Sequence, residues 1–241
     1  MYKNIAILTD NRLLAKKFER IIQSINSIEK IDFYVSPYSD ITDFEISGIE
    51  TLDIKNLKDA EYIIDNYDLV FSIHSKQIFP PNVVNNVKCI NVHPGYNPIN
   101  RGWYPQVFAI INETIVGSTI HEMDEELDNG LIIAQRIVEQ KSTDTSLTLY
   151  NRIVESEMAL LEENIHSIID GNYVGKMASE KGRLFLKKDF NKLKEIDLNQ
   201  KVTYREAIDR FRALTHGAYS NAYFIDKDSN KVYITIDLKK E

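Results

Sequence analysis

The sequence predicts an α/β fold in which a mostly parallel, Rossmann-like sheet carries helices on both faces and a small C-terminal appendage follows. Apolar runs of strand length at residues 4–8, 68–73 and 88–92 alternate with amphipathic runs of helix length. The pattern changes near residues 175–182, and the chain ends in two short strand-like runs around a polar turn. We therefore expect one domain at residues 1–178 and a small C-terminal region at 179–241.

The first half of the chain reads as repeated strand–helix units. After the first strand, Thr9, Asp10 and Asn11 can cap a helix. The apolar side of this helix is expected to hold Leu13, Leu14, Phe18, Ile21 and Ile22. The elements expected next are a strand at 33–35, a helix at 57–66, a strand at 68–73, a turn at Pro80-Pro81 and a strand at 88–92. Loops 9–11, 74–79 and 93–103 each follow a strand, so we expect them on one rim of the sheet, where ligands of such folds bind.

The second half begins with a helix at 104–112 that has a proline in its first turn. Further elements are expected as strands at 115–123 and 131–138, a long helix at 146–170 ended by Gly171, and a strand at 183–186. Thr203 and Glu206 form a capping box that opens a helix to Leu214. The runs at 222–225 and 231–236 flank a turn and predict a terminal β-hairpin.

Composition and charge exclude several protein classes. The chain has 241 residues, 43% hydrophobic and 27% charged, which is ordinary for a globular protein. Its formal net charge of −7 argues against a nucleic-acid partner. A lone Cys89 and no zinc-like spacing predict neither a disulfide nor a metal site. No apolar run reaches the roughly 18 residues of a membrane helix, and no signal peptide is evident, so we expect a cytoplasmic protein without a membrane partner.

No glycine-rich phosphate loop follows the first strand, where Asp10 and Asn11 stand instead. Dinucleotide-binding and P-loop folds require glycine at this turn, because the backbone must approach the phosphates closely. The sheet pattern therefore does not indicate a nucleotide cofactor of either kind.

Three polar residues form the strongest candidate for chemistry. Asn91 and His93 lie two residues apart at the end of a predicted strand and therefore share a face, and Asp128 follows about one strand pair later. An amide can stabilise an oxyanion, an imidazole can take a proton, and a carboxylate can orient that imidazole. The alternative interpretation is structural, because Asp128-Asn-Gly is also an ordinary turn sequence and strand-end polar residues often bond to backbone.

The trio lacks an adjacent nucleophile. Cys89 lies inside the predicted strand, and no serine is placed beside His93. The pattern therefore favours direct transfer between two bound substrates over a covalent enzyme intermediate.

Three stretches together resemble the N10-formyltetrahydrofolate-dependent formyltransferase family. They are Asn-Val-His-Pro-Gly-Tyr-Asn-Pro-Ile-Asn-Arg-Gly at 91–102, Gly-Ser-Thr-Ile-His-Glu-Met-Asp at 117–124 and Asp-Asn-Gly-Leu-Ile-Ile-Ala-Gln at 128–135. The loop after His93 differs from the Ser-Leu-Leu-Pro form of purine and methionyl-tRNA formyltransferases. It is similar to that of sugar N-formyltransferases, especially the 4-amino-4,6-dideoxyglucose enzymes of O-antigen and lipopolysaccharide synthesis.

The resemblance implies an enzyme that moves a formyl group from N10-formyltetrahydrofolate to the amine of a nucleotide-linked deoxyamino sugar, with dTDP-4-amino-4,6-dideoxyglucose as the expected substrate. Asn91 would stabilise the oxyanion, and His93 and Asp128 would share the proton transfer. The resemblance also implies two walls for the folate donor, with contacts from Ile73, His74, Ser75, Lys76, Phe79, Met123, Asp124 and Leu127. For His74 and Lys76 the alternative is an ordinary exposed loop position.

The nucleotide-sugar contacts are expected in two regions. In the loop after His93, Tyr96, Arg101, Trp103 and Tyr104 could cover a sugar or stack on a base, although a lone Trp often caps a core. Residues 176–212 contain eleven Lys/Arg and six Asp/Glu, a balance of 11 − 6 = +5 that suits a diphosphate or simply a solvated face. The residues selected from this region and the segment after it are Arg183, Lys187, Arg205, Arg212 and Tyr219; the last two could instead pack the hairpin.

The terminal hairpin predicts a homodimer, because its outer strand would offer an unpaired edge. Three related activities compete with sugar formylation, and a non-catalytic binding protein that keeps the pockets is an alternative from a different class, although the intact Asn91, His93 and Asp128 count against it. A methionyl-tRNA formyltransferase would need a larger, basic C-terminal domain, and a formyltetrahydrofolate hydrolase would carry an additional N-terminal domain. The purine formyltransferase differs at the loop after His93.

Overall fold

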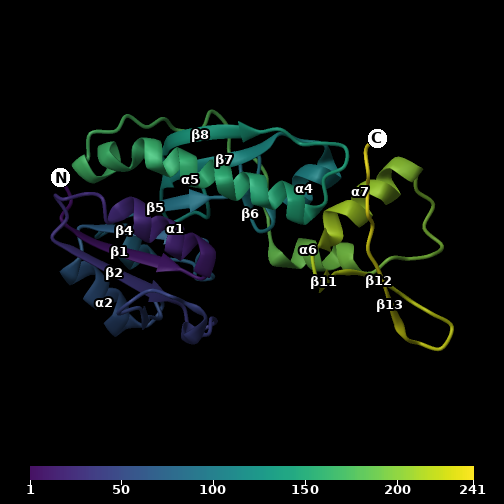
Figure 1. Ribbon diagram of the computed structural model, residues 1–241, viewed down its shortest axis with the longest axis horizontal. Coiled ribbons are helices and arrows are strands. Elements are labelled where there is room, and N and C mark those ends of the chain that lie inside the picture. Colours follow the sequence, from purple (N-terminus) through teal and green to yellow (C-terminus); the bar gives the residue numbers. More distant parts are fainter. The chain divides into compact units, whose positions relative to one another are not determined.

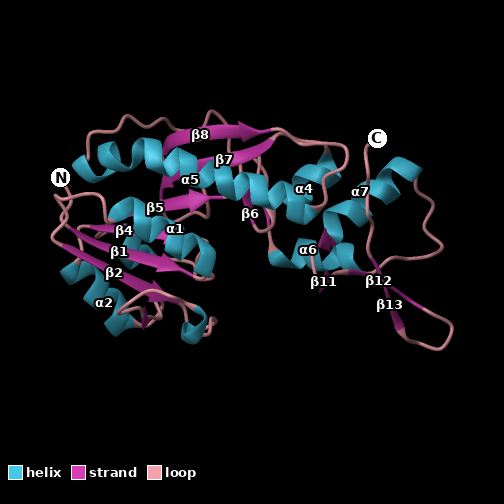
Figure 2. Cartoon of the chain, in the orientation of Figure 1, coloured by secondary structure: helices cyan, strands magenta, loops and turns pink.

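The computed structural model describes residues 1–241 and contains a seven-stranded central sheet with the strand order β3-β2-β1-β4-β5-β7-β8. Figures 1 and 2 show this sheet with its helices. The elements up to the middle of the sheet are β1 (Asn4–Thr9), α1 (Arg12–Ile22), β2 (Lys30–Val35), the 3₁₀ turn Ile41–Asp43, β3 (Glu50–Thr51), α2 (Leu57–Asn66), β4 (Leu69–Ile73), α3 (Pro81–Val84) and β5 (Lys88–His93). The predicted fold class is confirmed.

The later elements complete the sheet and form the C-terminal region. They are β6 (Arg101–Gly102), α4 (Pro105–Asn112), β7 (Val116–Glu122), β8 (Ile132–Val138), α5 (Ser146–Asp170), β9 (Leu184–Phe185), α6 (Lys187–Lys194), α7 (Tyr204–Leu214), β10 (Thr215–His216), β11 (Tyr219–Ser220), β12 (Ala222–Ile225) and β13 (Lys231–Ile234). The expected capping box of Thr203 and Glu206 and the terminal hairpin are both present. No helix combines the length and the apolar character that a membrane span requires.

The strands from β3 to β5 pair in parallel, whereas β5 and β7 pair antiparallel. Helices α2 and α3 cover one face, because Ala60 and Val83 share a buried cluster with Leu8 and Val70. Helix α1 covers the other face, where the Phe18 ring lies 5.1 Å from the ring of Phe71. The side chains of alternate strand residues therefore pack against the helices on opposite faces of the sheet, as the strand period of two requires.

Contacts divide the chain into two compact units, each assembled from three segments. The first contains Met1–His93, Thr119–Arg136 and Glu157–Lys181, and the second contains Pro94–Ser118, Ile137–Ser156 and Gly182–Glu241. The core of the second unit joins α4, α6, α7 and the hairpin through residues such as Phe108, Phe190 and Leu214. The domain division expected near residue 178 stays a prediction.

Three local features of the structure differ from the sequence predictions or add to them. Leu13 is 69% exposed, because the buried stripe of α1 runs through Leu14, Ala15, Phe18 and Ile22. The turn expected at Pro80-Pro81 also starts the short helix α3, where a proline without an N–H fits the first helical position. Helix α6 was not anticipated, because its eight residues carry few apolar side chains.

Candidate active site

Strands β5 and β7 bring three polar side chains to one face of the sheet. In their antiparallel register Asn91 pairs with His121, and His93 pairs with Thr119. Asn91 and His93 share a face because they are two residues apart, and a directly opposed residue such as His121 points the same way. The pairing of these two strands therefore gathers an amide and two imidazoles.

The loop between β7 and β8 delivers Asp128 to this face. Glu122 N–H donates to the carbonyl of Leu131 at 2.8 Å, which closes the loop at its base. A Cβ on Gly130 would lie only 2.0 Å from the carbonyl oxygen of Glu122, so no larger residue fits there. Asp128 itself has φ +50°, a left-handed conformation that is uncommon for a residue other than glycine.

The trio predicted from the sequence is assembled around the buried carboxylate of Asp128, which Asn91 and His93 both approach. Asn91 Nδ2 donates to Asp128 Oδ1 at 3.0 Å. His93 Nδ1 lies 3.6 Å from Asp128 Oδ2, which is close for a charge contact but long for a direct hydrogen bond. Asp128 and His93 are both buried, so their electrostatic interactions are weakly screened by water.

His121 is a fourth member of this network that sequence reasoning did not select. Its Nδ1 lies 2.6 Å from the carbonyl of Glu122, and because a carbonyl only accepts, Nδ1 must carry the hydrogen. In the neutral ring, Nε2 then accepts from Asn91 Nδ2 at 3.3 Å, and it also lies 3.6 Å from Asp128 Oδ1. Both amide hydrogens of Asn91 thus have acceptors, one on Asp128 and one on His121.

The residues expected to contact a folate donor lie on two segments of the first unit. Ile73 ends β4, and Phe79 is buried in the cluster against which Met123 packs. Asp124 serves its own loop, because its carboxylate accepts from Glu126 N–H at 2.9 Å and from Asn129 Nδ2 at 3.0 Å. Leu127 lies in the same loop, directly before Asp128.

Asp10 fixes the loop that follows β4. Its Oδ2 accepts from Lys76 N–H at 2.5 Å, and its Oδ1 accepts from the hydroxyls of Ser36 and Ser39 at 2.5 and 2.7 Å. Lys76 Nζ also donates to Ser39 Oγ at 3.0 Å, and Ser75 Oγ accepts from Gln77 N–H at 3.3 Å. Loops 9–11 and 74–79 therefore meet at the end of the parallel strands, as predicted.

In the second unit, the loop after His93 is joined to the segment that begins at Gly182. β6 pairs in parallel with β9, and Trp103 N–H donates to the Phe185 carbonyl at 2.8 Å. Gly182 has φ +66°, and a Cβ there would lie 1.9 Å from the carbonyl oxygen of Pro98, so this close approach requires glycine.

This junction places several residues expected to bind the nucleotide sugar side by side. Lys187 Nζ lies 5.6 Å from the centre of the Trp103 ring, and the Arg183 guanidinium lies 4.7 Å from that of Phe185. The ring of Tyr104 packs on Phe190 at 4.1 Å, and burial raises the pKa of its hydroxyl. The arrangement combines an indole face with a neighbouring cation.

Tyr96 and Arg101 come from the same loop but differ in accessibility. Tyr96 is half-buried, and its N–H donates to Asn100 Oδ1 at 3.1 Å. Arg101 is only 2% exposed, so a substrate contact by its guanidinium would require a ligand that enters the loop interior.

Arg205 and Arg212 line a separate cavity of about 680 Å³ in the second unit. Arg212 Nε donates to Asp209 at 2.6 Å, and Nη1 donates to the carbonyls of Lys141 and Asp144. These contacts account for its burial, and we propose a structural role for Arg212 rather than a substrate contact. Arg205 is exposed and lies 3.8 Å from Glu113.

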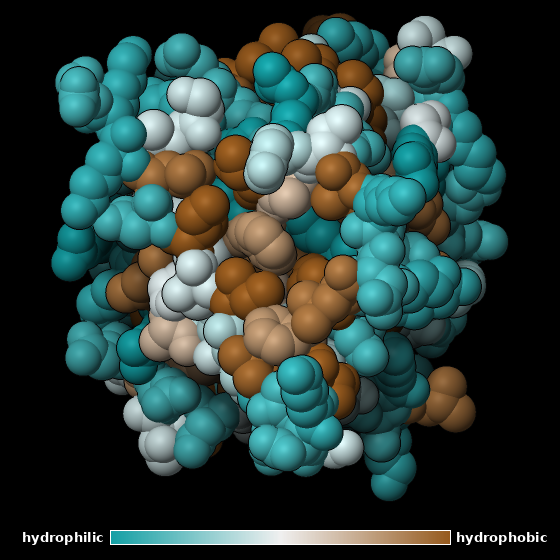
Figure 3. Space-filling model, turned by 90° about the vertical axis from the view of Figure 1, so that its right-hand side faces the viewer, coloured by the Kyte–Doolittle hydropathy of each residue, from teal (hydrophilic) through white to brown (hydrophobic).

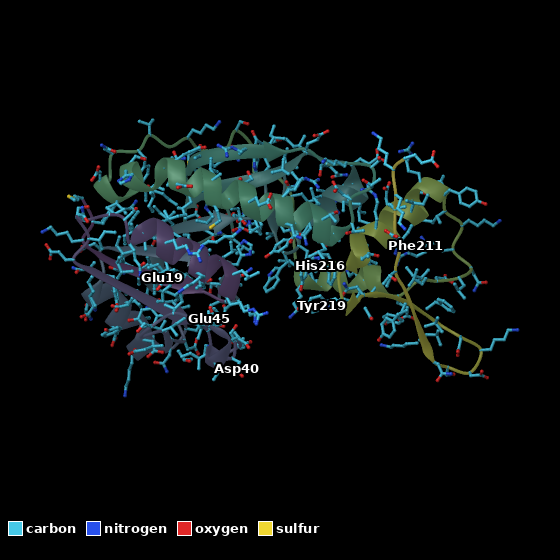
Figure 4. The ribbon with its side chains drawn as sticks, viewed as in Figure 1. Glu19, Asp40, Glu45, Phe211, His216 and Tyr219 are labelled. Carbon is cyan, nitrogen blue, oxygen red and sulfur yellow. The ribbon has the colours of Figure 1, made fainter.

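Tyr219 is exposed, and its ring lies 5.9 Å from that of His216 (Figure 4). His216 Nδ1 lies 3.0 Å from Ser146 Oγ, and burial lowers the pKa of this histidine. Tyr219 is therefore available to a ligand, whereas His216 is tied to the start of α5.

Comparison with known proteins supplies the family. The model of the formyl transferase family matches residues 58–165, and that of the N-formyltransferase dimerization C-terminal domain matches residues 189–240. A dTDP-4-amino-4,6-dideoxyglucose formyltransferase from Mycobacterium tuberculosis is 42% identical over 237 residues, which are 98% of this chain and 97% of the relative. This chain belongs to the sugar N-formyltransferases.

Solved structures agree with this family assignment. A 4-N formyltransferase from Francisella tularensis is 42% identical, with a TM-score of 0.94 over 99% of each chain. A formyltransferase from Anoxybacillus kamchatkensis is 27% identical with a TM-score of 0.62, covering 79% of this chain and 89% of that one. Its structure contains UDP-4,6-dideoxy-4-formamido-L-AltNAc and tetrahydrofolate.

Cys89 is poorly suited to act as a nucleophile in this sugar N-formyltransferase. It is buried within β5, its Sγ donates to the Val87 carbonyl at 3.5 Å, and burial raises the pKa of the thiol to about 12. The reactive thiolate is therefore scarce at neutral pH.

We expect Cys89→Ala to keep turnover within about twofold of wild type, since no covalent step uses the thiol. Stability should fall by about 1 kcal/mol, because a small cavity replaces the sulfur. Steady-state kinetics and thermal unfolding measure the two effects. A loss of turnover beyond about tenfold in a well-folded variant, or inactivation of the native enzyme by stoichiometric alkylation of Cys89, would contradict this expectation.

Proposed function

We propose that this N-formyltransferase moves the formyl group of N10-formyltetrahydrofolate to the amine of a nucleotide-linked amino-dideoxy sugar, with dTDP-4-amino-4,6-dideoxyglucose as its substrate. The observation that carries the proposal is that Asn91 and His93 both lie against the buried carboxylate of Asp128. The near full-length relative named for this sugar supports the choice of substrate.

The first unit has features that suit a folate donor. A pterin ring needs an apolar wall together with polar groups that fix its orientation. Met123 is partly buried and supplies apolar surface, with the buried Phe79 packed behind it, and the backbone of the loops at 74–79 and 123–128 supplies polar groups. Ile73 is fully buried at the end of β4. The donor supplies the formyl carbon that the amine attacks.

In the reaction we assign each member of the trio a role. Asn91 Nδ2 donates to the formyl oxygen as negative charge develops on it. His93 turns Nδ1 toward Asp128, so its Nε2 is the nitrogen that can take the proton released by the attacking amine and return it to N10 of tetrahydrofolate as the bond between N10 and the formyl carbon breaks. Asp128 stabilises the imidazolium that results, as a nearby carboxylate does for any cation in a buried site.

The test is formyl transfer by purified enzyme supplied with both substrates. His93→Ala and Asp128→Ala should each lower turnover by a factor on the order of 10² or more, because each removes a proton-transfer group. Matched controls are His166→Ala and Asp65→Ala, which alter exposed residues on α5 and α2. Formamide product and the far-ultraviolet circular dichroism spectrum are measured for each variant.

Full activity in either trio variant would show that the assigned roles are wrong. Release of formate at the same rate with and without the amino sugar would identify a hydrolase instead.

The junction of loop 101–104 with residues 183–187 is the proposed nucleotide-binding element. Trp103 offers a stacking face for the base, and Lys187 beside it offers a cation for the diphosphate. Arg183 lies one residue before β9 and adds positive charge to the same element.

Lys187→Ala should weaken binding of dTDP about tenfold, the cost of one charge-assisted hydrogen bond. Trp103→Ala should weaken it to a similar degree and also reduce discrimination among dTDP, UDP and GDP. Isothermal titration calorimetry measures all three ligands. Lys188→Ala is the matched control, since it removes the same charge from the neighbouring exposed position; equal losses in the Lys187 and Lys188 variants would rule out a specific contact.

We propose that the C-terminal region forms a homodimer through the hairpin, in line with the family of its dimerization domain. β12 is bridged to Glu195 on its outer side, with Ile196 N–H donating to the Tyr223 carbonyl at 2.7 Å. β13 forms the other edge, and Ile225 and Tyr233 are exposed on the hairpin. Figure 3 shows the side of the molecule that is on the right in Figure 1, where α7 and β13 are drawn, and hydrophobic side chains lie near its middle. Apolar exposure of this kind marks interaction surfaces.

Ile225→Asp and Tyr233→Asp should convert the dimer to a monomer, because each places a charge on the proposed contact. Sedimentation velocity at micromolar concentration measures the change. Val174→Asp, at the exposed Val174 of the first unit, should leave the dimer intact. A wild-type monomer, or hairpin variants that remain dimeric, would refute the proposed interface.

A further inference from the structure

Glu157 is a fully buried carboxylate on α5 that the proposed chemistry does not use. His74 Nε2 lies between its two oxygens, 3.0 Å from Oε1 and 2.9 Å from Oε2. An ionised carboxylate can only accept, so Nε2 carries the hydrogen of this contact. A carboxylate removed from water is tolerated when it is paired, and His74 is the group that pairs with it here.

His74 occupies an unusual backbone position. It is the first residue after β4 and has φ +51°, in the left-handed region that residues with a Cβ seldom adopt. β4 pairs with β5 so that Ile73 lies beside Val92, which places the turn at His74 next to the strand end that carries His93. Such a conformation persists where surrounding contacts hold it, and it is often found at functional sites.

The rest of this loop is held from the other side. Lys76 N–H donates to Asp10, and the Gln77 side chain bonds to Ile54 N–H and to the Leu52 carbonyl at 2.9 Å each. Residues 76 and 77 are thus fixed to the segments after β1 and β3, whereas His74 is fixed to α5. If the contact with α5 were lost, the left-handed turn at the start of the loop would lose its side-chain anchor.

We infer that His74 and Glu157 are a positioning pair that holds the wall of the donor pocket in its binding conformation. The inference rests on the proposed function, because it takes residues 73–79 as a wall of the folate site. The pair acts through the loop and not on the reacting atoms. Its loss is therefore expected to weaken donor binding while leaving the nucleotide-binding element at Trp103 and Lys187 unaffected.

The experiment compares His74→Ala, His74→Gly and Glu157→Leu with wild type. In His74→Ala and Glu157→Leu the KM for N10-formyltetrahydrofolate should rise on the order of tenfold, with the KM for the amino sugar within about twofold. His74→Gly separates the two features of this position, since glycine adopts a positive φ without strain. It should behave like His74→Ala, because the anchor to α5 is missing in both.

The double variant His74→Gln with Glu157→Gln tests whether the pair itself matters. Two amides can restore a hydrogen bond without a buried charge, so this variant should recover most of the donor KM lost in His74→Ala. Calorimetric titration with tetrahydrofolate gives a second readout that is independent of turnover. His166→Ala, at an exposed position on α5, is the matched control.

The outcomes separate this inference from the proposed function. If wild type transfers formyl groups and binds tetrahydrofolate but the single variants keep the wild-type donor KM, the pair has no positioning role. Equal increases in both KM values, or lowered melting temperatures with unchanged KM values, would show a structural role alone and also overturn the inference. Wild type that neither binds tetrahydrofolate nor transfers a formyl group would refute the proposed function itself.

Discussion

The buried carboxylate of Asp128 is the constraint on which the arrangement of the site depends. In a poorly hydrated environment a carboxylate must be met by donors. Asn91 Nδ2 donates to Asp128, and ring nitrogens of His93 and His121 each lie 3.6 Å from one of its oxygens. The carboxylate therefore helps to orient the Asn91 amide and the His93 ring, whereas His121 is also held by the Glu122 carbonyl. Replacing Asp128 by an apolar residue would remove the acceptor of one Asn91 hydrogen and the charge beside His93.

The antiparallel pairing of β5 and β7 makes this convergence possible. In a purely parallel sheet, β7 would run in the other direction, and His121 would not lie opposite Asn91. Since the two strands are antiparallel, Glu122 at the end of β7 lies opposite Ile90, so the loop that carries Asp128 starts beside the first half of β5, and Gly130 permits its close approach to the Glu122 carbonyl. The chemistry thus depends on the point at which the sheet departs from the parallel pattern.

Much of the fold could be predicted from local patterns, because strand and helix periods, the Thr203 capping box and the hairpin turn are encoded within short windows. The trio could be selected because Asn91 and His93 share a face by spacing alone. His121 was missed, since its place depends on a register between strands that no local pattern encodes. For Arg212 the sequence left substrate contact and packing as alternatives for a similar reason: its carbonyl partners lie about 70 positions earlier in the chain.

The contacts of Asn91 suggest how the site could favour the transition state over bound substrate. One amide hydrogen is directed to Asp128, and the other to Nε2 of His121, which accepts it when that ring is neutral. A neutral formyl oxygen would gain little by displacing that imidazole, because both are uncharged acceptors. An oxygen that bears negative charge forms a hydrogen bond roughly twice as strong, so it would displace the imidazole of His121 as the acceptor of this hydrogen. The amide would then bind its target strongly only as the reaction proceeds, and stabilisation confined to that stage is what accelerates a chemical step.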